Sequence, residues 1–326
     1  MMGPEAPEVV DDFSLLDSLE FVNGIPCYTD SHVVAGSKIF ERIGWDDRVG
    51  GTYLAIAGDK ELVLRVDAKR SGVVAMESIF LKRAEGAGLW PFFSQVHSAW
   101  ASDGLVFLTV YFRQGPTLRQ CLDFVKIGHF SPGTALYLGR GVLRCLRQLH
   151  SLGYVARCLD RELFHFCAAG RMVFMADISN IRVDPTSMGL PPASWTGGSL
   201  FAPLSFHTEA KELTRGDELE SWLYLLCHLA TGQLPWDSVR AEEVEKVKAS
   251  VDLGLPEGWK PLQLLVKRAS GQRVVEEEIY DQLEAALSEM LKEAGVASDD
   301  NNLDFEREPS QEELPKFVLE KRPIEE

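Results

Sequence analysis

The chain has 326 residues, of which 45% are hydrophobic and 25% charged, as is typical of a soluble globular protein with one large or two ordinary domains. Its net charge of −16 argues against binding to nucleic acid or an anionic membrane, because clustered Lys and Arg hold such partners. No apolar run is long enough to cross a bilayer and no secretory leader is visible, so we expect a cytoplasmic location, with the nucleus left open.

The acidic charge gathers at the two ends of the chain. Residues 1–37 contain seven acidic residues and no Lys or Arg, whereas residues 297–326 contain ten acidic and four basic residues. We therefore divide the chain into an acidic N-terminal extension (1–34), a folded domain (35–296) and an acidic C-terminal tail (297–326). Asp11–Phe21 interleaves acidic and apolar residues, so it either binds a partner as an amphipathic helix or packs on its own domain.

The first half of the folded domain has the pattern of a small sheet with one helix. Thr52–Ala57 and Glu61–Asp67 are β-branched and apolar runs, and the tripeptide Gly58–Lys60 between them predicts a hairpin. Leu105–Phe112 is a further predicted strand. Val73–Arg83 has the apolar spacing of a helix.

The second half is mostly helical. Ser131 can cap a helix that begins at Pro132, because its apolar residues then recur every three or four positions. A hairpin is predicted over Leu163–Asp177, and a second helix begins at about Asp217. A last helix covers about Val275–Glu293, with acidic residues in its first turn, where they favour the helix dipole.

The six cysteines are scattered, and none forms a CxxC pair. This usage predicts reduced, mostly buried thiols and no metal site. Cys158, His165 and Cys167 with Asp160 could instead form a metal site or a reactive thiol. We favour buried thiols, because the spacing fits no common zinc pattern.

Four segments of the chain carry motifs that occur together in one known family. They are Ser131–Phe166 (a helix and catalytic loop), Thr196–His207 (TGTxRYASxNxH), Thr214–Trp236 (DDLES…LPW) and Ser298–Glu306 (DPFDWE). Together they resemble the casein kinase 1 superfamily, and most closely its tau-tubulin kinase-like branch. The resemblance implies an α+β, bilobal protein-kinase-like fold. It would have a small β-rich N-lobe at about 35–115 and a larger α-helical C-lobe at about 116–296.

The family's glycine-rich loop corresponds here to Ile43–Tyr53, and only Gly44 is kept as a vestige of its first half. Trp45 adds bulk, while Asp46 and Asp47 add negative charge where the family closes backbone N–H groups on phosphate. We interpret this segment as an ordinary acidic hairpin turn.

Other nucleotide-binding positions of the family are partly kept. Arg65 stands in place of the strand lysine, and with Glu77 in the helix it could form a structural bridge. Val63 replaces an alanine and should crowd the adenine, and Tyr111 is expected at the back wall of the pocket. Asp177 matches the metal-binding aspartate. We expect it to bond to nearby backbone, and weak nucleotide or cation binding is the alternative.

The family's catalytic loop is changed at three positions. Cys158 replaces the aspartate that accepts the hydroxyl proton, Asp160 replaces a lysine, and Leu163 replaces the asparagine that holds a metal ion. Leu200 replaces an arginine that can hold acidic substrates. Asp217 matches the family's position for tying down the catalytic-loop backbone, so the frame is kept while the chemistry is lost.

We therefore expect a pseudokinase: a catalytically inactive kinase-like domain that acts as a protein-binding scaffold or allosteric regulator. Its partner would be an active kinase or a cytoskeletal protein. No cofactor or metal is expected, although weak ATP and Mg²⁺ binding stays open. One alternative is an atypical, weakly active Ser/Thr protein kinase that still binds ATP and uses Asp160 or Asp177. Another is a decaying paralogue with little role.

Overall fold

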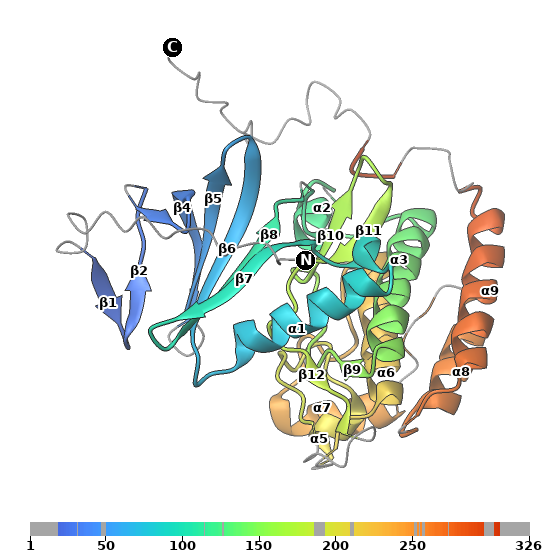
Figure 1. The fold of residues 1–326 in the computed structure, drawn as a ribbon. Helices are drawn as coiled ribbons and strands as arrows, with labels where there is room; N and C mark the ends of the chain where they lie inside the picture. The colour runs from blue at the N-terminus through green and yellow to red at the C-terminus, as the bar shows by residue number, and fades with distance from the viewer. Residues whose placement is uncertain are drawn as a thin grey trace.

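The computed structural model describes residues 19–30, 32–46, 50–113, 115–125, 127–185, 193–208, 212–250, 253, 255, 258–272, 274–296 and 303–306. They form two lobes, one built mainly from strands and the other mainly from helices (Figure 1). The predicted α+β bilobal arrangement is therefore confirmed.

The N-terminal lobe is a six-stranded antiparallel sheet with strand order β3-β4-β5-β6-β8-β7 and one long helix beside it (Figure 1). The elements are β3 (Val33–Val34), β4 (Ser37–Asp46), β5 (Gly50–Ala57), β6 (Lys60–Ala68), α1 (Val73–Gly86), β7 (Val96–Ser102) and β8 (Leu105–Tyr111). The predicted hairpin is confirmed as β5 and β6, and Gly58 at its turn has φ of 63°, which glycine adopts without strain.

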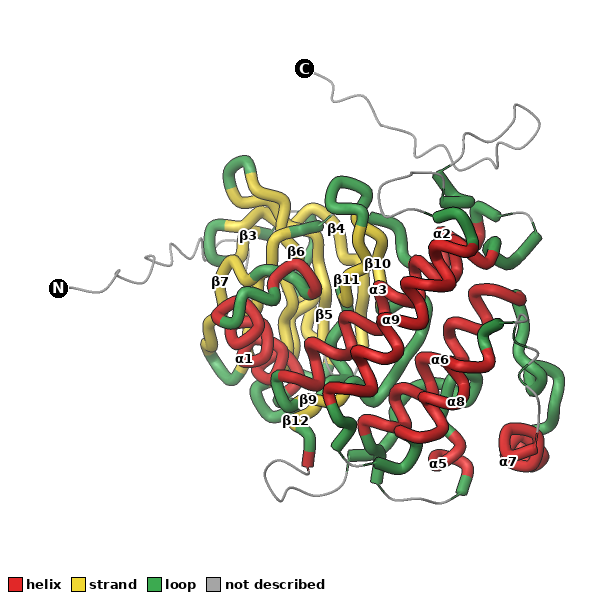
Figure 2. Tube along the Cα trace, turned by 90° about the vertical axis from the view of Figure 1, so that its right-hand side faces the viewer, coloured by secondary structure: helices red, strands yellow, loops and turns green. Residues whose placement is uncertain are grey.

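The C-terminal lobe packs helices around two small hairpins (Figure 2). Its helices are η2 (Trp90–Phe92), α2 (Leu118–Asp123), α3 (Pro132–Ser151), α5 (Leu204–His207), α6 (Arg215–Thr231), α7 (Ala241–Ser250), α8 (Lys260–Ala269) and α9 (Glu277–Glu293). Its strands are β9 (Tyr154–Val155), β10 (Phe164–Cys167), β11 (Met172–Met175) and β12 (Arg182–Val183). Ser131 caps α3 by accepting a hydrogen bond from the backbone of Thr134, as predicted.

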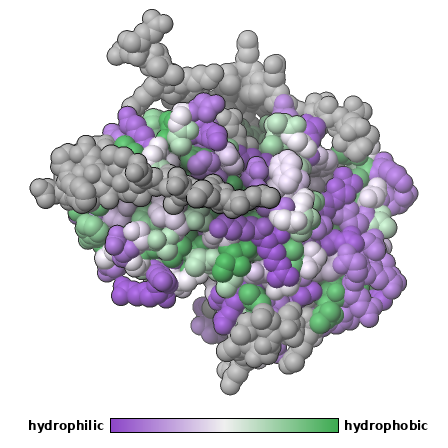
Figure 3. Space-filling model, viewed as in Figure 1, coloured by the Kyte–Doolittle hydropathy of each residue, from purple (hydrophilic) through white to green (hydrophobic). Residues whose placement is uncertain are grey.

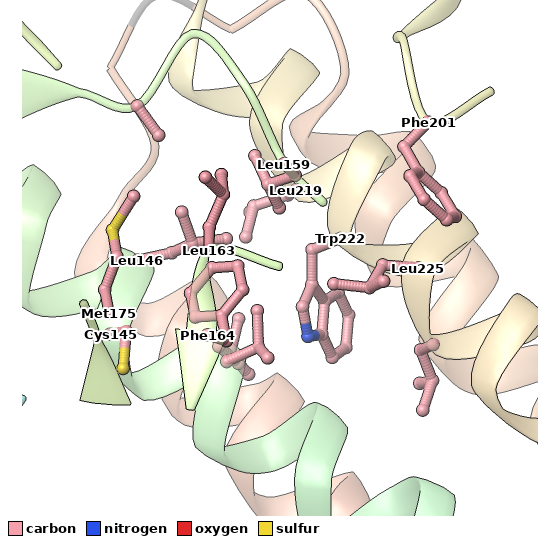
Figure 4. Packing of buried hydrophobic residues seen from close by; sticks show 14 of the residues in the cluster. Cys145, Leu146, Leu159, Leu163, Phe164, Met175, Phe201, Leu219, Trp222 and Leu225 are labelled. Atoms are coloured by element: carbon pink, nitrogen blue, oxygen red, sulfur yellow. The ribbon is translucent and has the colours of Figure 1, made fainter. Parts of the chain in front are cut away.

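A large apolar core joins α1 to the C-terminal lobe. Trp222 on α6 is fully buried there, and its indole N–H donates to the carbonyl of Gly139 on α3 at 2.8 Å. Because Trp222 is buried among leucines and aromatic rings, it fixes α6 against α3 (Figure 4). The surface over α9, at the right of Figure 3, is by contrast mainly hydrophilic.

A second, smaller core lies on the other face of the N-lobe sheet and is covered by an N-terminal hairpin. Its strands are β1 (Glu20–Val22) and β2 (Ile25–Cys27). The Tyr53 hydroxyl donates to the Pro26 carbonyl at 3.3 Å and accepts from the Tyr28 N–H at 3.2 Å. The last two residues of the Asp11–Phe21 stretch are thus in a strand and not in a helix, and its residues 11–18 lie outside the described residues.

A short C-terminal segment, Leu303–Glu306, binds back onto the C-terminal lobe. The Asp304 carboxylate accepts hydrogen bonds from the backbone N–H of Ser131 at 2.6 Å and from its hydroxyl at 3.0 Å. Glu306 forms a two-pronged ion pair with Arg171, at 2.9 and 3.0 Å. This segment therefore joins the start of α3 to the β10–β11 hairpin. The division of the chain at 34 and 296 stays a prediction, although packed residues occur on the outer side of each boundary.

Replacing Phe305 with Ala should lower the free energy of unfolding by about 2 kcal/mol, because a partly buried ring leaves a cavity between its neighbours. Its ring centroid lies 5.9 Å from that of Phe130 and 5.2 Å from that of Phe166. Urea denaturation measures the change. Phe124→Ala removes a ring that is 53% exposed and serves as control, with an expected change below about 0.5 kcal/mol. Equal effects of the two substitutions would contradict the packing role of Phe305.

In the part of the chain that the structure describes, no helix combines the length and apolar character needed to span a bilayer. All six cysteines are free; five are buried and Cys158 is partly exposed.

Candidate functional site

The positions that the sequence singled out lie where the two lobes meet. Arg65 comes from β6, Glu77 from α1, and Asp177 from the segment after β11. Cys158 lies in the loop between β9 and β10, near enough to Asp177 to feel its charge. Gly44 is further away, on β4 beside Thr52.

Arg65 is the charged centre of this cleft. Its Nη1 atom lies 2.7 Å from Glu77 Oε1 and 3.8 Å from Asp177 Oδ1. The contact with Glu77 is an ion pair outside hydrogen-bonding geometry, since Oε1 has no aligned donor. The arginine thus neutralises both carboxylates and joins the sheet to α1, the structural bridge expected from the sequence.

Glu77 holds its charge at a cost. The residue is 1% exposed, and burial raises the pKa of its carboxyl from 4.5 to about 7. The Arg65 guanidinium acts in the opposite direction but does not offset the loss of hydration. The carboxylates of Asp177 and Asp67 raise the pKa further.

Asp177, the retained metal-binding position, makes a local bond. Its Oδ1 atom accepts a hydrogen bond from the backbone N–H of Ser179 at 2.9 Å. This is the nearby backbone contact that the sequence reading favoured. The side chain is still 46% exposed, so one face of the carboxylate is open to the cleft.

Cys158 has a neutral thiol. Burial raises its pKa to about 12, and the nearby carboxylates of Asp160, Asp177 and Glu218 act in the same direction. A Cβ atom built on Gly197 would lie 2.8 Å from its sulfur, so the thiol lies against the Thr196–His207 segment. A thiol in this state has no tendency to accept a proton at neutral pH.

The other two changed loop positions are equally unsuited to phosphate transfer. Leu163 is 7% exposed and belongs to the large core, beside Phe164 and Leu146 in Figure 4. Its side chain has no oxygen to offer a metal ion. Asp160 accepts a hydrogen bond from the backbone N–H of Glu162 at 3.2 Å, so it stabilises its own loop.

The residue that ties down this loop is Glu218 and not Asp217, which corrects the sequence interpretation. Glu218 Oε1 accepts a hydrogen bond from the backbone N–H of Arg157 at 2.6 Å. Arg157 has φ of 65°, a conformation that costs a non-glycine residue energy and needs support. Asp217 instead completes the capping box of α6 with Thr214.

Glu218 also anchors a buried polar chain that the sequence reading missed. Its second oxygen, Oε2, lies 2.7 Å from His150 Nε2, and the other ring nitrogen of His150 contacts the Tyr280 hydroxyl. Glu218 is fully buried and His150 is 2% exposed. The loop position is therefore set by α3, α6 and α9 together. The signal in sequence would have been an acidic residue in an otherwise apolar stretch of α6.

The glycine-loop segment differs from expectation in the placement of Trp45. The β4–β5 hairpin pairs Trp45 with Gly51, and the indole packs against the core on the outer face of the sheet. Trp45 therefore does not fill the cleft. The backbone of Asp46 pairs with Gly50, while Asp47 lies outside the described residues.

Tyr111 does not form the back wall of the cleft. Along β8, Leu108 pairs with Arg65 and Val110 pairs with Val63, so these side chains share the cleft face. Tyr111 points to the opposite face, where its ring lies 5.3 Å from the ring of His97. Val110, also part of the large core, takes the expected place.

The substrate-side position Leu200 is held by its backbone. The indole N–H of Trp236 donates to the Leu200 carbonyl at 2.8 Å, and the leucine side chain packs against the core. The other candidate metal set is not brought together as a site: His165 Nδ1 lies 3.0 Å from the Gly115 carbonyl. No group of three or more His, Cys, Asp or Glu among the described residues could hold a metal ion.

An open pocket with a cavity volume of about 630 Å³ lies beside α2, at the edge of the cleft. It is lined by six residues with polar side chains: Thr117, Arg119, Gln120, Asp123, Glu162 and Asp177. Acidic groups outnumber basic ones in this lining, so the pocket is poorly suited to a polyphosphate without bound cations.

Comparison with known proteins gives several partial matches, and no protein-family model matches the chain. The piRNA biogenesis factor prde-1 of Caenorhabditis elegans is 25% identical over 219 residues, which is 60% of this chain and 42% of that protein. A probable casein kinase I homolog of Encephalitozoon cuniculi is 26% identical over 188 residues, 52% of this chain and 60% of that protein. The Ser/Thr-protein kinase spe-6 of C. elegans is 31% identical over 141 residues, 40% of this chain and 36% of that protein.

Each match thus spans less than two thirds of the relative's own length. Among solved structures, that of vaccinia related kinase 3 matches with a TM-score of 0.65 and 20% sequence identity, over 87% of this chain and 95% of that one. The predicted protein-kinase-like fold is confirmed by this likeness.

Proposed function

We propose that this chain, which has a protein-kinase-like fold and relatives among casein kinase I and Ser/Thr protein kinases, is a catalytically inactive member of the tau-tubulin kinase-like branch. It would act in the cytoplasm as a protein-binding scaffold or an allosteric regulator. Its partner would be an active kinase or a cytoskeletal protein. Neither a cofactor nor a metal ion is part of this proposal.

The observation that carries the proposal is the placement of Arg65. Its guanidinium lies between Glu77 at 2.7 Å and Asp177 at 3.8 Å, so the chain itself neutralises the carboxylate that would otherwise hold a metal ion. Because the same contact holds α1 to the sheet, the lobes keep their arrangement without help from a nucleotide. This supports a role that depends on shape.

The loop after β9 supports the same conclusion. A neutral thiol at Cys158 and a core leucine at Leu163 supply neither a base nor a metal ligand. A well-placed acid or base alone contributes about 10²- to 10⁴-fold in rate. One relative, prde-1, is named for piRNA biogenesis and not as a kinase, which agrees with a role other than phosphate transfer.

The test is thermal unfolding with and without ATP and Mg²⁺. A ligand at about 100 times its Kd stabilises a protein by about 2.7 kcal/mol and would raise Tm by several degrees. We expect no saturable rise, and no incorporation of labelled phosphate into protein substrates. An active casein kinase 1 domain measured in parallel shows that the assay works. A saturable rise in Tm together with phosphate transfer would overturn the proposal.

The second candidate is the weakly active Ser/Thr kinase, which the partial exposure of Asp177 at the pocket favours. The variant Asp177→Ala separates the two. If wild-type protein transfers phosphate and Asp177→Ala does not, this candidate holds, whereas equal and negligible activity of both supports the inactive scaffold.

A further inference from the structure

Lys248, on α7, is a buried lysine far along the chain from the cleft residues. Its residue surface is only 7% exposed, whereas Glu245 and Lys246 on the same helix are exposed. Burying an ammonium group costs free energy unless its surroundings replace the lost water. The contacts of Lys248 therefore indicate what holds this helix in place.

The Nζ atom of Lys248 has a complete set of polar neighbours. It donates to the carbonyl of Ser199 at 3.0 Å and to that of Ala202 at 2.6 Å, and it lies 3.1 Å from His207 Nε2. An ammonium group has three N–H donors, and these three acceptors match them in number. All three belong to the Ser199–His207 segment.

Two aromatic rings of the C-terminal lobe complete the surroundings. The Nζ atom lies 4.7 Å from the centroid of Trp236 and 5.1 Å from that of Tyr224, within the range of cation–π attraction. Glu220 lies nearby on α6 and accepts a hydrogen bond from the backbone N–H of Leu204 at 2.9 Å. The lysine is thus surrounded by α5, α6 and the segment before α5.

Few other contacts attach α7 to the domain. The helix lies at the lower edge of the C-terminal lobe beside α5 in both views (Figures 1 and 2). Among the described residues of α7, Val244 and Lys248 are the buried ones. A helix of ten residues with so small an apolar face depends on tertiary contacts to stay folded.

We propose that Lys248 is a latch that joins α7 to the Ser199–His207 segment, so that loss of its hydrogen bonds frees α7 while the rest of the domain stays folded. The latch needs neither nucleotide nor catalysis, and it holds whether or not the domain is inactive. It sets whether α7 and this segment present one rigid surface or two independent ones.

The latch also responds to protonation, and the direction follows from linkage. Burial lowers the pKa of Lys248 from 10.5 to about 8, with Glu220 acting against the shift. The facing His207 has its pKa lowered to about 4 by burial and by Lys248, and burial raises the pKa of Glu220 and of Tyr224. Because the latched lysine holds its proton less tightly than a solvated one, the latched state is favoured as pH rises from about 8 to 10.5.

Hydrogen exchange of the full chain, corrected for the intrinsic rate at each pH, tests the latch. Wild-type α7 should gain protection about tenfold between pH 8 and 9, because each unit above the lysine pKa shifts the opening equilibrium about tenfold. In Lys248→Met, which leaves the buried carbonyls without their donor, protection of α7 should fall at least about tenfold, while α3 is unchanged. Lys246→Met is the matched control and should behave as wild type.

Lys248→Arg keeps the proposal testable if Lys248→Met fails to fold. Arginine stays charged at these pH values, so α7 should lose its pH-dependent gain in protection. The proposal is overturned if α7 is as protected in Lys248→Met as in wild type, if α3 and α7 lose protection by the same factor, or if the gain persists in Lys248→Arg.

Discussion

Replacing Glu218 with Leu is expected to lower the free energy of unfolding by about 3–5 kcal/mol, the cost of removing one partner from a buried charged network. The carboxylate is fully buried and serves both the Arg157 N–H and His150. Leucine fills the volume but leaves both groups without a partner in a dry site. The loop that carries Cys158 should lose its fixed position as well.

Urea denaturation measures the loss, and two variants calibrate it. Tyr280→Phe removes the far end of the same chain and should cost about 1–2 kcal/mol. Asp160→Leu removes a carboxylate of the same loop that bonds only to the backbone of Glu162 among the described contacts, and should cost less than about 1 kcal/mol. A Glu218→Leu protein within about 1 kcal/mol of wild type would show that another group holds the loop.

Replacing Glu77 with Gln is expected to stabilise the protein at alkaline pH relative to acidic pH. The folded-state pKa of Glu77 is about 7, above its usual 4.5, so between these values the folded chain binds more protons than the unfolded one. Stability contributed by this group therefore rises as pH falls from 7 to 4.5, and it is lost above 7. Glutamine has no such dependence.

The difference between Glu77→Gln and wild type should consequently change by about 3 kcal/mol between pH 8 and pH 4.5, in favour of the variant at pH 8. Denaturation curves at several pH values measure it, and other carboxylates cancel because they are common to both proteins. Asp103→Asn, on an exposed turn, is the control and should leave the profile unchanged. If the variant were instead less stable by an equal amount at every pH, Glu77 would not titrate in this range.

The sequence was a good guide wherever the structure depends on local pattern. The hairpin β5–β6 and helices α1 and α3 follow from turn residues and apolar spacing, and α9 begins at Glu277, two residues after the predicted start. The hairpin β1–β2 was missed although Asn23-Gly24 is a strong turn signal, with φ of 54° and 80°. Strand β7 (Val96–Ser102) has no strong alternation and is formed by pairing with β8.

The site could be predicted in identity but not in orientation. Which residues stand at Cys158, Asp160 and Leu163 is legible from motifs. Which face a side chain takes depends on pairing: a shift of one residue along a strand reverses the face, and this is why Trp45 and Tyr111 were misplaced.

A single step along a helix matters in the same way. One residue turns the side chain by about 100°, so choosing between Asp217 and Glu218 needed the rotation of α6 against α3. Motif matching fixes neither this rotation nor the burial that raises the pKa of Glu77.

The hairpin β1–β2 and the segment Leu303–Glu306 decide how the protein should be cut for laboratory work. An expression fragment limited to 35–296 would strip Tyr53 of both hydroxyl partners and the start of α3 of the Asp304 carboxylate. Such a fragment would expose apolar surface at opposite ends of the molecule and tend to aggregate. Recombinant versions should therefore span at least 20–306.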